Sequence, residues 1–254
     1  MLWGRVLHAG REFFGSIVGE TLHVYAGRLF VDARDTGDVL SLRDATWLTP
    51  SEPTKMIGLW NNYHRAAQKN GWTIPKEPLY FAKTANSFNA HMRTIPAPKS
   101  YTGRVFFEGE LGIVIGSTCV GVSIGEASEC IFGYTCINDV TALELVAQDS
   151  AFPQWTRAKS FDGFGVFGPV IATDIDALRL TVRTIVDGRE RQNYPTSDMI
   201  YKPAELVSLI SRDMTFFPGD IIACGTSLGV LPMRRGTAIE VAIDGIGILR
   251  NIYE

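Results

Sequence analysis

An apolar run from Val105 to Gly116 is interrupted by two glutamates, Glu108 and Glu110, and this segment constrains the fold more than any other. Side chains of an extended strand alternate between faces, so residues two apart project to the same side and both carboxylates point one way. Burial and mutual repulsion would raise the pKa of both groups unless a cation or strong donors keep them charged. The segment therefore predicts a strand whose two carboxylates bind a hard divalent metal ion.

The composition is that of a globular protein that binds a small molecule. With 254 residues, of which 46% are hydrophobic, the chain can form one substantial core, with or without a small appendage. The net charge of -3 comes from interspersed residues with no basic stripe, so neither nucleic acid nor an anionic membrane is expected as a partner. A small-molecule ligand remains.

Three sequence features predict a cytoplasmic protein. No apolar stretch reaches the roughly eighteen residues of a membrane-spanning helix. The segment from Met1 to Gly15 contains charged residues where a signal peptide would be apolar. The cysteines lack the close paired spacing of zinc or redox motifs, so we expect reduced, packed thiols. They are Cys119, Cys130, Cys136 and Cys224.

The chain divides into a short N-terminal part and a long C-terminal part. Residues 1–50 alternate short apolar runs with turn residues, which predicts β-hairpins. Pro50 and Pro53 disfavour any regular element and predict a linker. We therefore expect a small N-terminal β-rich domain over residues 1–53 and a larger domain over residues 54–254 that carries the site.

Short strands outnumber helices in the larger part. Residues 87–104 contain prolines and few periodic apolar positions, which predicts a long loop. Ser123 and Glu126 have capping-box spacing, which predicts a short helix ending near Gly133. Further helices are expected over residues 140–148 and 203–211, and strands over residues 135–137, 221–224 and 238–243. The expected class is a β-dominated α+β fold.

Asp139 is the natural third carboxylate, because it follows an apolar strand and is separated from the two glutamates by one expected strand, one helix and another strand. Three carboxylates and water molecules form an oxygen-only site, which favours Mg²⁺ or Mn²⁺ over zinc, since zinc prefers histidine or cysteine ligands. The alternative without a metal is that Glu108 and Glu110 pair with arginines on a solvated sheet face.

Three further residues are candidates for the chemistry. Lys159 lies in an aromatic-flanked segment without helical periodicity, where it could stabilise negative charge on an enolate or carboxylate; the alternative is a surface lysine. His64 is the obvious base for activating water at neutral pH, and His91 in the predicted loop is a second candidate. The alternative for both is an ordinary surface histidine.

A serine hydrolase is excluded by the order of the residues. Gly121 to Gly125 match the nucleophile-elbow pattern around Ser123, but hydrolases of that fold place the catalytic histidine after the serine. All four histidines of this chain precede Ser123, so we interpret the serine as a helix N-cap. No phosphate loop or dinucleotide-binding fingerprint occurs.

Residues 54–254 resemble the fumarylacetoacetate hydrolase superfamily through a series of short blocks in the same order. The first blocks are Gly58 with His64, Glu77-Pro78 with Phe81-Ala82-Lys83, Phe107 to Leu111, Gly133-Tyr134-Thr135 and Asn138-Asp139-Val140. The later blocks are Arg157 to Asp162, Gly168-Pro169, Thr196 to Ile200, Pro218-Gly219-Asp220 with Gly225-Thr226, and Gly245-Ile246-Gly247.

The resemblance implies a mixed β-roll or sandwich around a deep metal site, usually in a homodimer. It implies that Glu108, Glu110 and Asp139 hold Mg²⁺ or Mn²⁺, and that a 2-oxo or 2-hydroxy-dienoic acid binds there. It also implies that Lys159 contacts an oxyanion or carboxylate of the substrate and that Thr226 contacts its carboxylate. Hydrolysis, decarboxylation and tautomerisation are the reactions implied, all through a metal-stabilised enolate or related oxyanion.

The proton-transfer residues depart from the family pattern. Counting from Gly58 without a gap, the resemblance makes His64 the base. If Asn62-Tyr63 is instead aligned with the family's Asn-Tyr pair, Ala66 takes the place of that histidine. In members with a His-Glu dyad an acid follows the histidine by three positions, whereas three positions after His64 this chain has Ala67.

The predicted substrate anchor also differs. Many members have an arginine four positions after the metal aspartate and a glutamine seven positions after it, whereas this chain has Leu143 and Val146. These apolar residues indicate a pocket for a less polar substrate tail. Lys83, Arg157 or Arg93 could supply the positive charge instead.

The leading hypothesis is a divalent-metal-dependent enzyme of 2-oxo acid catabolism that cleaves a C–C bond by hydrolysis or decarboxylation. Tautomerisation of 2-hydroxy-dienoic acids is the alternative, because it needs no dyad to activate water. A hypothesis of another class is a non-catalytic, metal-dependent ligand-binding protein, and it is favoured by Leu143, Val146 and Ala67.

Overall fold

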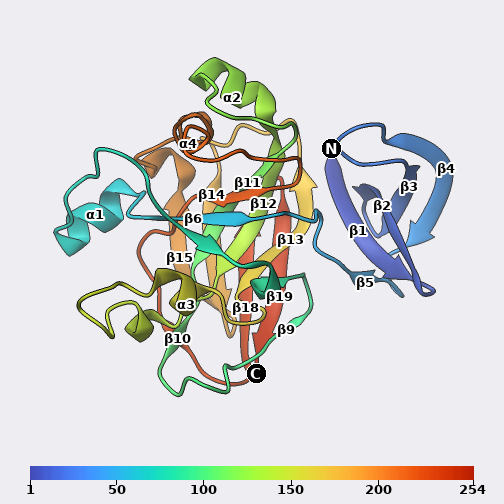
Figure 1. Ribbon diagram of the computed structural model, residues 1–254. Coiled ribbons are helices and arrows are strands. Elements are labelled where there is room, and N and C mark those ends of the chain that lie inside the picture. The colour runs from blue at the N-terminus through green and yellow to red at the C-terminus, as the bar shows by residue number, and fades with distance from the viewer.

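Five N-terminal strands form a small lobe in the computed structural model, which describes residues 1–254 (Figure 1). The strands are β1 (Leu2–His8), β2 (Arg11–Val18), β3 (Thr21–Ala26), β4 (Arg34–Ser41) and β5 (Thr46–Trp47). They pair in the order β4-β3-β2-β1, with β5 beside β1, and the hairpins predicted for residues 1–50 are confirmed. Leu2 and Trp3 pair with Ala172 and Ile171 of the larger body. A domain boundary at residue 53 stays a prediction.

The main sheet of the body has the strand order β13-β12-β11-β16-β6-β7, and β1 of the lobe extends it beyond β13. Its members are β6 (Met56–Trp60), β7 (Leu79–Lys83), β8 (Phe88–Asn89), β11 (Gly109–Ile115), β12 (Ile131–Asp139), β13 (Gly165–Ala172) and β16 (Ile221–Ala223). All residues of β11 and β13 are buried, which explains why these segments are almost continuously apolar.

A second sheet has the order β15-β14-β18-β19-β9. Its strands are β9 (Thr94–Ile95), β14 (Thr181–Val186), β15 (Arg189–Pro195), β18 (Thr237–Ile243) and β19 (Gly247–Tyr253). It packs on the main sheet through contacts of β14, β18 and β19 with β11, β12 and β13 (Figure 1). A short pair, β10 (Val105–Phe106) with β17 (Pro232–Met233), lies outside both sheets. The predicted β-dominated α+β class is confirmed.

The helices are short and lie around the sheets (Figure 1). They are α1 (His64–Asn70), α2 (Ile124–Cys130), α3 (Trp155–Lys159) and α4 (Pro203–Ile210), with the 3-10 turns η1 (Ala85–Ser87), η2 (Leu143–Leu145) and η3 (Thr196–Asp198). Ser123 caps α2 in the predicted capping box with Glu126, and α4 matches the predicted helix over residues 203–211. No helix has the length and apolar character needed to span a membrane.

The structure differs from the sequence-based expectations of local structure at three places. Residues 140–148 form only the 3-10 turn η2 and no α-helix, because the Thr141 carbonyl, which would accept the Leu145 N–H in an α-helix, accepts the Phe106 N–H instead. Lys159 ends the short helix α3, although its segment lacks helical periodicity. The predicted loop over residues 87–104 contains two short strands, β8 and β9, which pair with β13 and β19.

Candidate functional site

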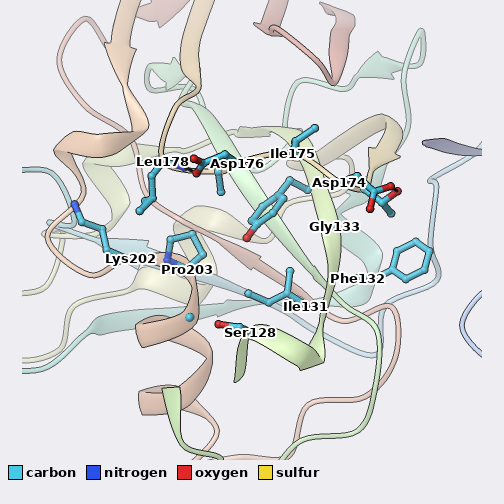
Figure 2. A pocket seen from close by; sticks show the side chains of 14 residues that line it. Ser128, Ile131, Phe132, Gly133, Asp174, Ile175, Asp176, Leu178, Lys202 and Pro203 are labelled. Atoms are coloured by element: carbon cyan, nitrogen blue, oxygen red, sulfur yellow. Dashed lines mark hydrogen bonds between the residues drawn. The ribbon is translucent and has the colours of Figure 1, made fainter. Parts of the chain in front are cut away.

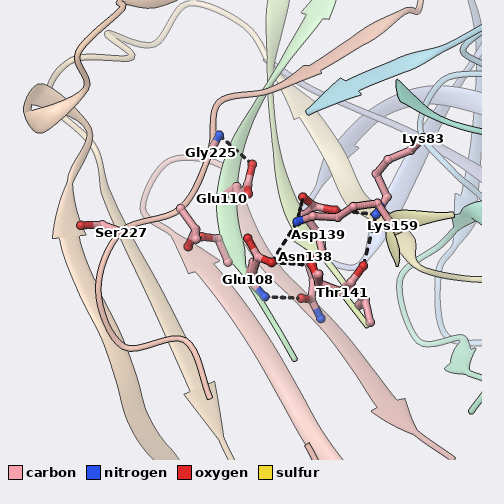
Figure 3. A network of polar contacts seen from close by, with 12 residues as sticks. Lys83, Glu108, Glu110, Asn138, Asp139, Thr141, Lys159, Gly225 and Ser227 are labelled. Atoms are coloured by element: carbon pink, nitrogen blue, oxygen red, sulfur yellow. Dashed lines mark hydrogen bonds and ion pairs between the residues drawn. The ribbon is translucent and has the colours of Figure 1, made fainter. Parts of the chain in front are cut away.

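Two adjacent strands of the main sheet bring the three predicted carboxylates together (Figure 3). β11 and β12 run antiparallel, with Gly109 opposite Asn138, so Glu110 on β11 lies near Asp139 at the end of β12. Glu108 lies in the break between β10 and β11, where its carbonyl accepts the Asp139 N–H at 2.9 Å. Each residue offers an oxygen within 4.8 Å of the other two.

Two buried lysines neutralise part of this acidic group. Lys159 donates from Nζ to Asp139 Oδ2 at 2.5 Å and to Glu108 Oε1 at 2.8 Å. Lys83 donates to the other oxygen of Asp139 and to the Val140 carbonyl. Three carboxylates thus face two ammonium groups, which leaves one negative charge without a partner when all are ionised.

Burial and charge act against each other at these groups. Burial would raise the pKa of Asp139, but Lys159 and Lys83 outweigh it and hold that pKa below its usual value. Burial raises the pKa of Glu108, with Lys159 opposing the shift, and it raises that of Glu110 further because both other carboxylates add to it. Burial would lower the pKa of Lys159, but the three carboxylates raise it above its usual range.

The uncompensated charge lies at Glu110. Its Oε2 accepts the Gly225 N–H at 2.8 Å, whereas its Oε1 is buried without any hydrogen-bond partner. A buried anionic oxygen without a partner is costly, and a cation among the three carboxylates would remove that cost. The donor set is all oxygen, which suits a hard divalent ion. The residues present therefore fit a metal ion.

A hydrogen-bond network fixes the backbone between the two glutamates. The Gly109 carbonyl accepts from the hydroxyls of Thr226 and Tyr194, and the Gly109 N–H donates to Gln192 Oε1 at 2.9 Å. Gln192 also donates from Nε2 to Thr226 Oγ1 at 2.9 Å. Sequence reasoning missed Gln192 and Tyr194, because only their spacing of two on β15 indicates that they share a face.

A cavity of about 390 Å³ opens beside the carboxylates. Glu108 and Lys159 are its only titratable lining residues, and Thr226 also lines it. The remaining wall is mostly apolar or aromatic, and it is formed by Leu59, Trp60, Asn61, Ala66, Asn70, Trp72, Phe81, Phe106, Leu143, Trp155, Ser227, Leu228, Gly229 and Val230. The sequence predicted Lys159 and Thr226 at the site but not the aromatic wall.

The structure does not bring every candidate residue to this cavity. His64 is exposed at the start of α1 and does not line it, whereas Ala66 does. Arg157 is exposed and bonds weakly to Gln148 at 3.5 Å. His91 is buried away from the carboxylates, where its Nδ1 accepts the Arg250 N–H at 3.0 Å.

A second cavity of about 440 Å³ lies elsewhere on the body, beside α2 and α4 (Figure 2). Asp174, Asp176 and Lys202 are its charged lining residues. These two aspartates do not belong to any group of three or more acidic, histidine or cysteine residues close enough to share a metal ion, since only Glu108, Glu110 and Asp139 form one. The carboxylate-lysine cluster is therefore the stronger candidate for chemistry.

Solved structures similar to this chain include two mycobacterial proteins. One is a 2-hydroxyhepta-2,4-diene-1,7-dioate isomerase from Mycobacterium marinum, with 36% identity, a TM-score of 0.91 and coverage of 100% of this chain and 98% of that chain. The other is a 5-carboxymethyl-2-hydroxymuconate delta-isomerase from Mycobacterium smegmatis, with 34% identity, a TM-score of 0.92 and coverage of 100% and 99%.

A third similar structure is a fumarylacetoacetate hydrolase from the psychrophilic Exiguobacterium antarcticum, with 30% identity, a TM-score of 0.88 and coverage of 100% of this chain and 99% of that chain. The N-terminal residues 1–50 match a family model described as Rv2993c-like, N-terminal. Residues 55–252 match the model of the fumarylacetoacetate hydrolase C-terminal domain. The chain therefore belongs to the fumarylacetoacetate hydrolase family.

Proposed function

We propose that this protein is a metal-dependent isomerase that interconverts 2-hydroxy-dienoic acids and their 2-oxo tautomers. The observation that carries the proposal is the cavity wall, whose only titratable side chains are Glu108 and Lys159. Tautomerisation moves a proton from the enol oxygen to a carbon and consumes no water, so one acceptor and one donor suffice. The two similar mycobacterial proteins named as isomerases support the same reaction class.

The proposed cofactor is Mg²⁺ or Mn²⁺, held by Glu108, Glu110 and Asp139. The partnerless oxygen of Glu110 and the oxygen-only donor set support this choice. When bound, the ion would stabilise negative charge that develops on a 2-oxo acid.

Lys159 and Glu108 are the proposed catalytic pair. The three carboxylates hold the pKa of Lys159 above its usual range despite burial, so its Nζ is an ammonium that donates to a developing oxyanion. Glu108 Oε1, which lies 2.8 Å from that nitrogen, is the acceptor on the same wall.

Other predicted residues take different parts in this proposal. The Thr226 hydroxyl lines the cavity and is the proposed contact for the substrate carboxylate. Lys83 is proposed to orient Asp139 from the side that faces away from the cavity. Its Nζ bonds to the Asp139 carboxylate, and its side chain does not line the cavity. We assign no proton-transfer role to His64 and no substrate contact to Arg157, since both are exposed and outside the cavity wall.

Hydrolysis is the second candidate, and the similar hydrolase from Exiguobacterium antarcticum favours it. It requires a base that activates water. Ala66 lines the cavity at the position where one alignment with the family places that base, and His64 does not line it. The site therefore supports tautomerisation better than hydrolysis. A cytosolic location and a homodimer remain our predictions from the sequence.

The test is incubation of the protein with Mn²⁺ or Mg²⁺ and a panel of 2-hydroxymuconate-type dienoates, 2-hydroxy-2,4-dienoates with an aryl or alkyl end, acylpyruvates and oxaloacetate, in D₂O. Isomerisation should give a 2-oxo-enoate product of unchanged skeleton with one deuterium on carbon, seen by NMR and by loss of the dienol absorbance. Formation of two acids would instead identify a hydrolase, and released CO₂ a decarboxylase. No reaction with any compound would favour the non-catalytic ligand-binding protein.

A further inference from the structure

A third cavity, of about 740 Å³, adjoins the site cavity, and we call it the outer cavity. Three aromatic side chains line both cavities, namely Trp60, Phe81 and Trp155. The rest of the outer cavity wall is formed by Pro78, Leu79, Tyr80, Val146, Ala147, Asp149, Ser150 and Pro153. Because these three side chains line the site cavity as well as the outer cavity, a molecule bound at the carboxylates can lie along them.

The shared side chains form an ordered aromatic row. Phe81 and Trp155 stack with ring centroids 5.5 Å apart and planes 8° from parallel. Trp60 continues the row, with its ring centroid 6.1 Å from that of Trp155 and 4.9 Å from that of Trp72. At the inner end, Lys159 Nζ lies 4.8 Å from the centroid of Phe81. The row therefore starts at the charged site and leads away from it.

The charged residues that line the two cavities are Glu108 and Lys159 in the site cavity and Asp149 in the outer cavity. No arginine or histidine lines either cavity, and Lys159 is their only lysine. Its ammonium is already bonded to Asp139 and Glu108. A carboxylate at the far end of a substrate would face aromatic rings and the side chain of Asp149, without a cation to replace its hydration.

We propose that the substrate carries an uncharged apolar tail, aryl or alkyl, and that this tail lies along Trp60, Phe81 and Trp155. The inference rests on the proposed function for the reacting end of the substrate and adds the chemical class of the other end. It separates this protein from enzymes of dicarboxylic dienoates, because a second carboxylate gains nothing from this wall. Aromatic tails gain most, since aromatic pairs prefer such stacked or edge-to-face contacts.

Binding of two matched acids tests the tail independently of turnover. 4-Phenyl-2-oxobutanoate and 2-oxoglutarate share the same 2-oxo acid end and differ in a phenyl group against a carboxylate. In the presence of Mn²⁺, calorimetry should give a Kd at least about tenfold lower for the phenyl compound. Equal or tighter binding of 2-oxoglutarate would overturn the apolar tail, whether or not the protein isomerises dienoates. Tight phenyl binding without isomerisation would overturn the proposed function alone.

A charge-introducing variant locates the tail. Leu79 lines the outer cavity with 42% of its surface exposed, so Leu79→Arg places a cation beside the proposed tail without disturbing the core. It should lower the Kd for 2-oxoglutarate about tenfold and raise that for the phenyl compound. Leu178→Arg is the matched control, because Leu178 is 40% exposed and lines the separate cavity of Figure 2. The same change in both variants would overturn the assigned tail position.

Discussion

At Glu110, the two carboxylate oxygens have different surroundings. This difference predicts that a substitution there weakens metal binding without destabilising the metal-free protein. Glu110→Gln keeps an acceptor for the Gly225 N–H but removes the buried charge. It should weaken Mn²⁺ binding by at least about tenfold, since even residues that only hydrogen-bond to metal ligands contribute that much to metal affinity. The melting temperature of the metal-free protein should stay constant or rise, because an uncompensated buried charge is lost. Mn²⁺ titration by electron paramagnetic resonance and thermal unfolding check both results.

Glu129→Gln is the matched control for this prediction. Glu129 is exposed on α2, so the variant makes the same change of net charge away from the site. Its Mn²⁺ affinity should equal that of the wild type. Unchanged Mn²⁺ binding by Glu110→Gln, or an equal loss in both variants, would contradict the assignment of Glu110 as a ligand.

The sequence indicated that Glu108, Glu110 and Asp139 come together, as the structure shows, because their signal is local. Charged side chains at Glu108 and Glu110 stand out inside an apolar strand, and Asp139 ends another such strand. The candidates for the base, His64 and Ala66, were harder to place, because no local pattern distinguishes them. His64 could be aligned with the family in two ways that differ by two positions, and the burial of Ala66 and exposure of His64 could be read only from the structure.

At the level of elements, the contact between β11 and the second sheet explains the glycine between the two glutamates. A Cβ atom at Gly109 would lie 2.0 Å from Thr184 Oγ1 on β14. Gly109→Ala should therefore push the sheets apart and lower the free energy of unfolding by about 1–3 kcal/mol, the range for overpacked cores. Urea unfolding followed by circular dichroism measures this loss.

Gly125 offers the opposite outcome with the same substitution. It lies in α2, and a Cβ atom there would have no neighbour within 4 Å. Gly125→Ala should stabilise the protein by about 0.5–1 kcal/mol, because alanine favours the helix. If Gly109→Ala were as stable as wild type in the same experiment, the close approach of β14 to Gly109 would be wrong.

Elements were predictable where their own sequence pattern decides them. The capping box of α2 and the apolar strands β11 and β12 are of this kind. Residues 140–148 are not, because Thr141 pairs with Phe106 in a distant part of the chain. The helix α3 is likewise held by a distant contact, since Trp155 stacks on Phe81 of β7. Tertiary contacts of this kind leave no periodicity in the sequence.

At the scale of the whole molecule, His91 connects the N-terminal lobe to the body. Its ring meets Trp47 of β5 edge to face, with centroids 5.2 Å apart. Its Nδ1 accepts the N–H of Arg250 on β19, so the imidazole is neutral at this position. Burial, with a smaller contribution from Arg250, lowers the pKa of His91 from 6.5 to about 4. The joint between lobe and body therefore contains a histidine that folding keeps unprotonated.

This joint predicts an acid-dependent loss of stability. Between about pH 6.5 and pH 4 the unfolded chain binds a proton at His91 that the folded chain excludes. The contribution of His91 to stability is thus complete above pH 6.5 and falls as the pH is lowered to 4. His91→Asn keeps an acceptor for the Arg250 N–H but cannot titrate, so its melting temperature should decrease less steeply over this range. His64→Asn, at an exposed position, should follow the wild type. Parallel curves for wild type and His91→Asn would show that His91 does not couple proton binding to folding.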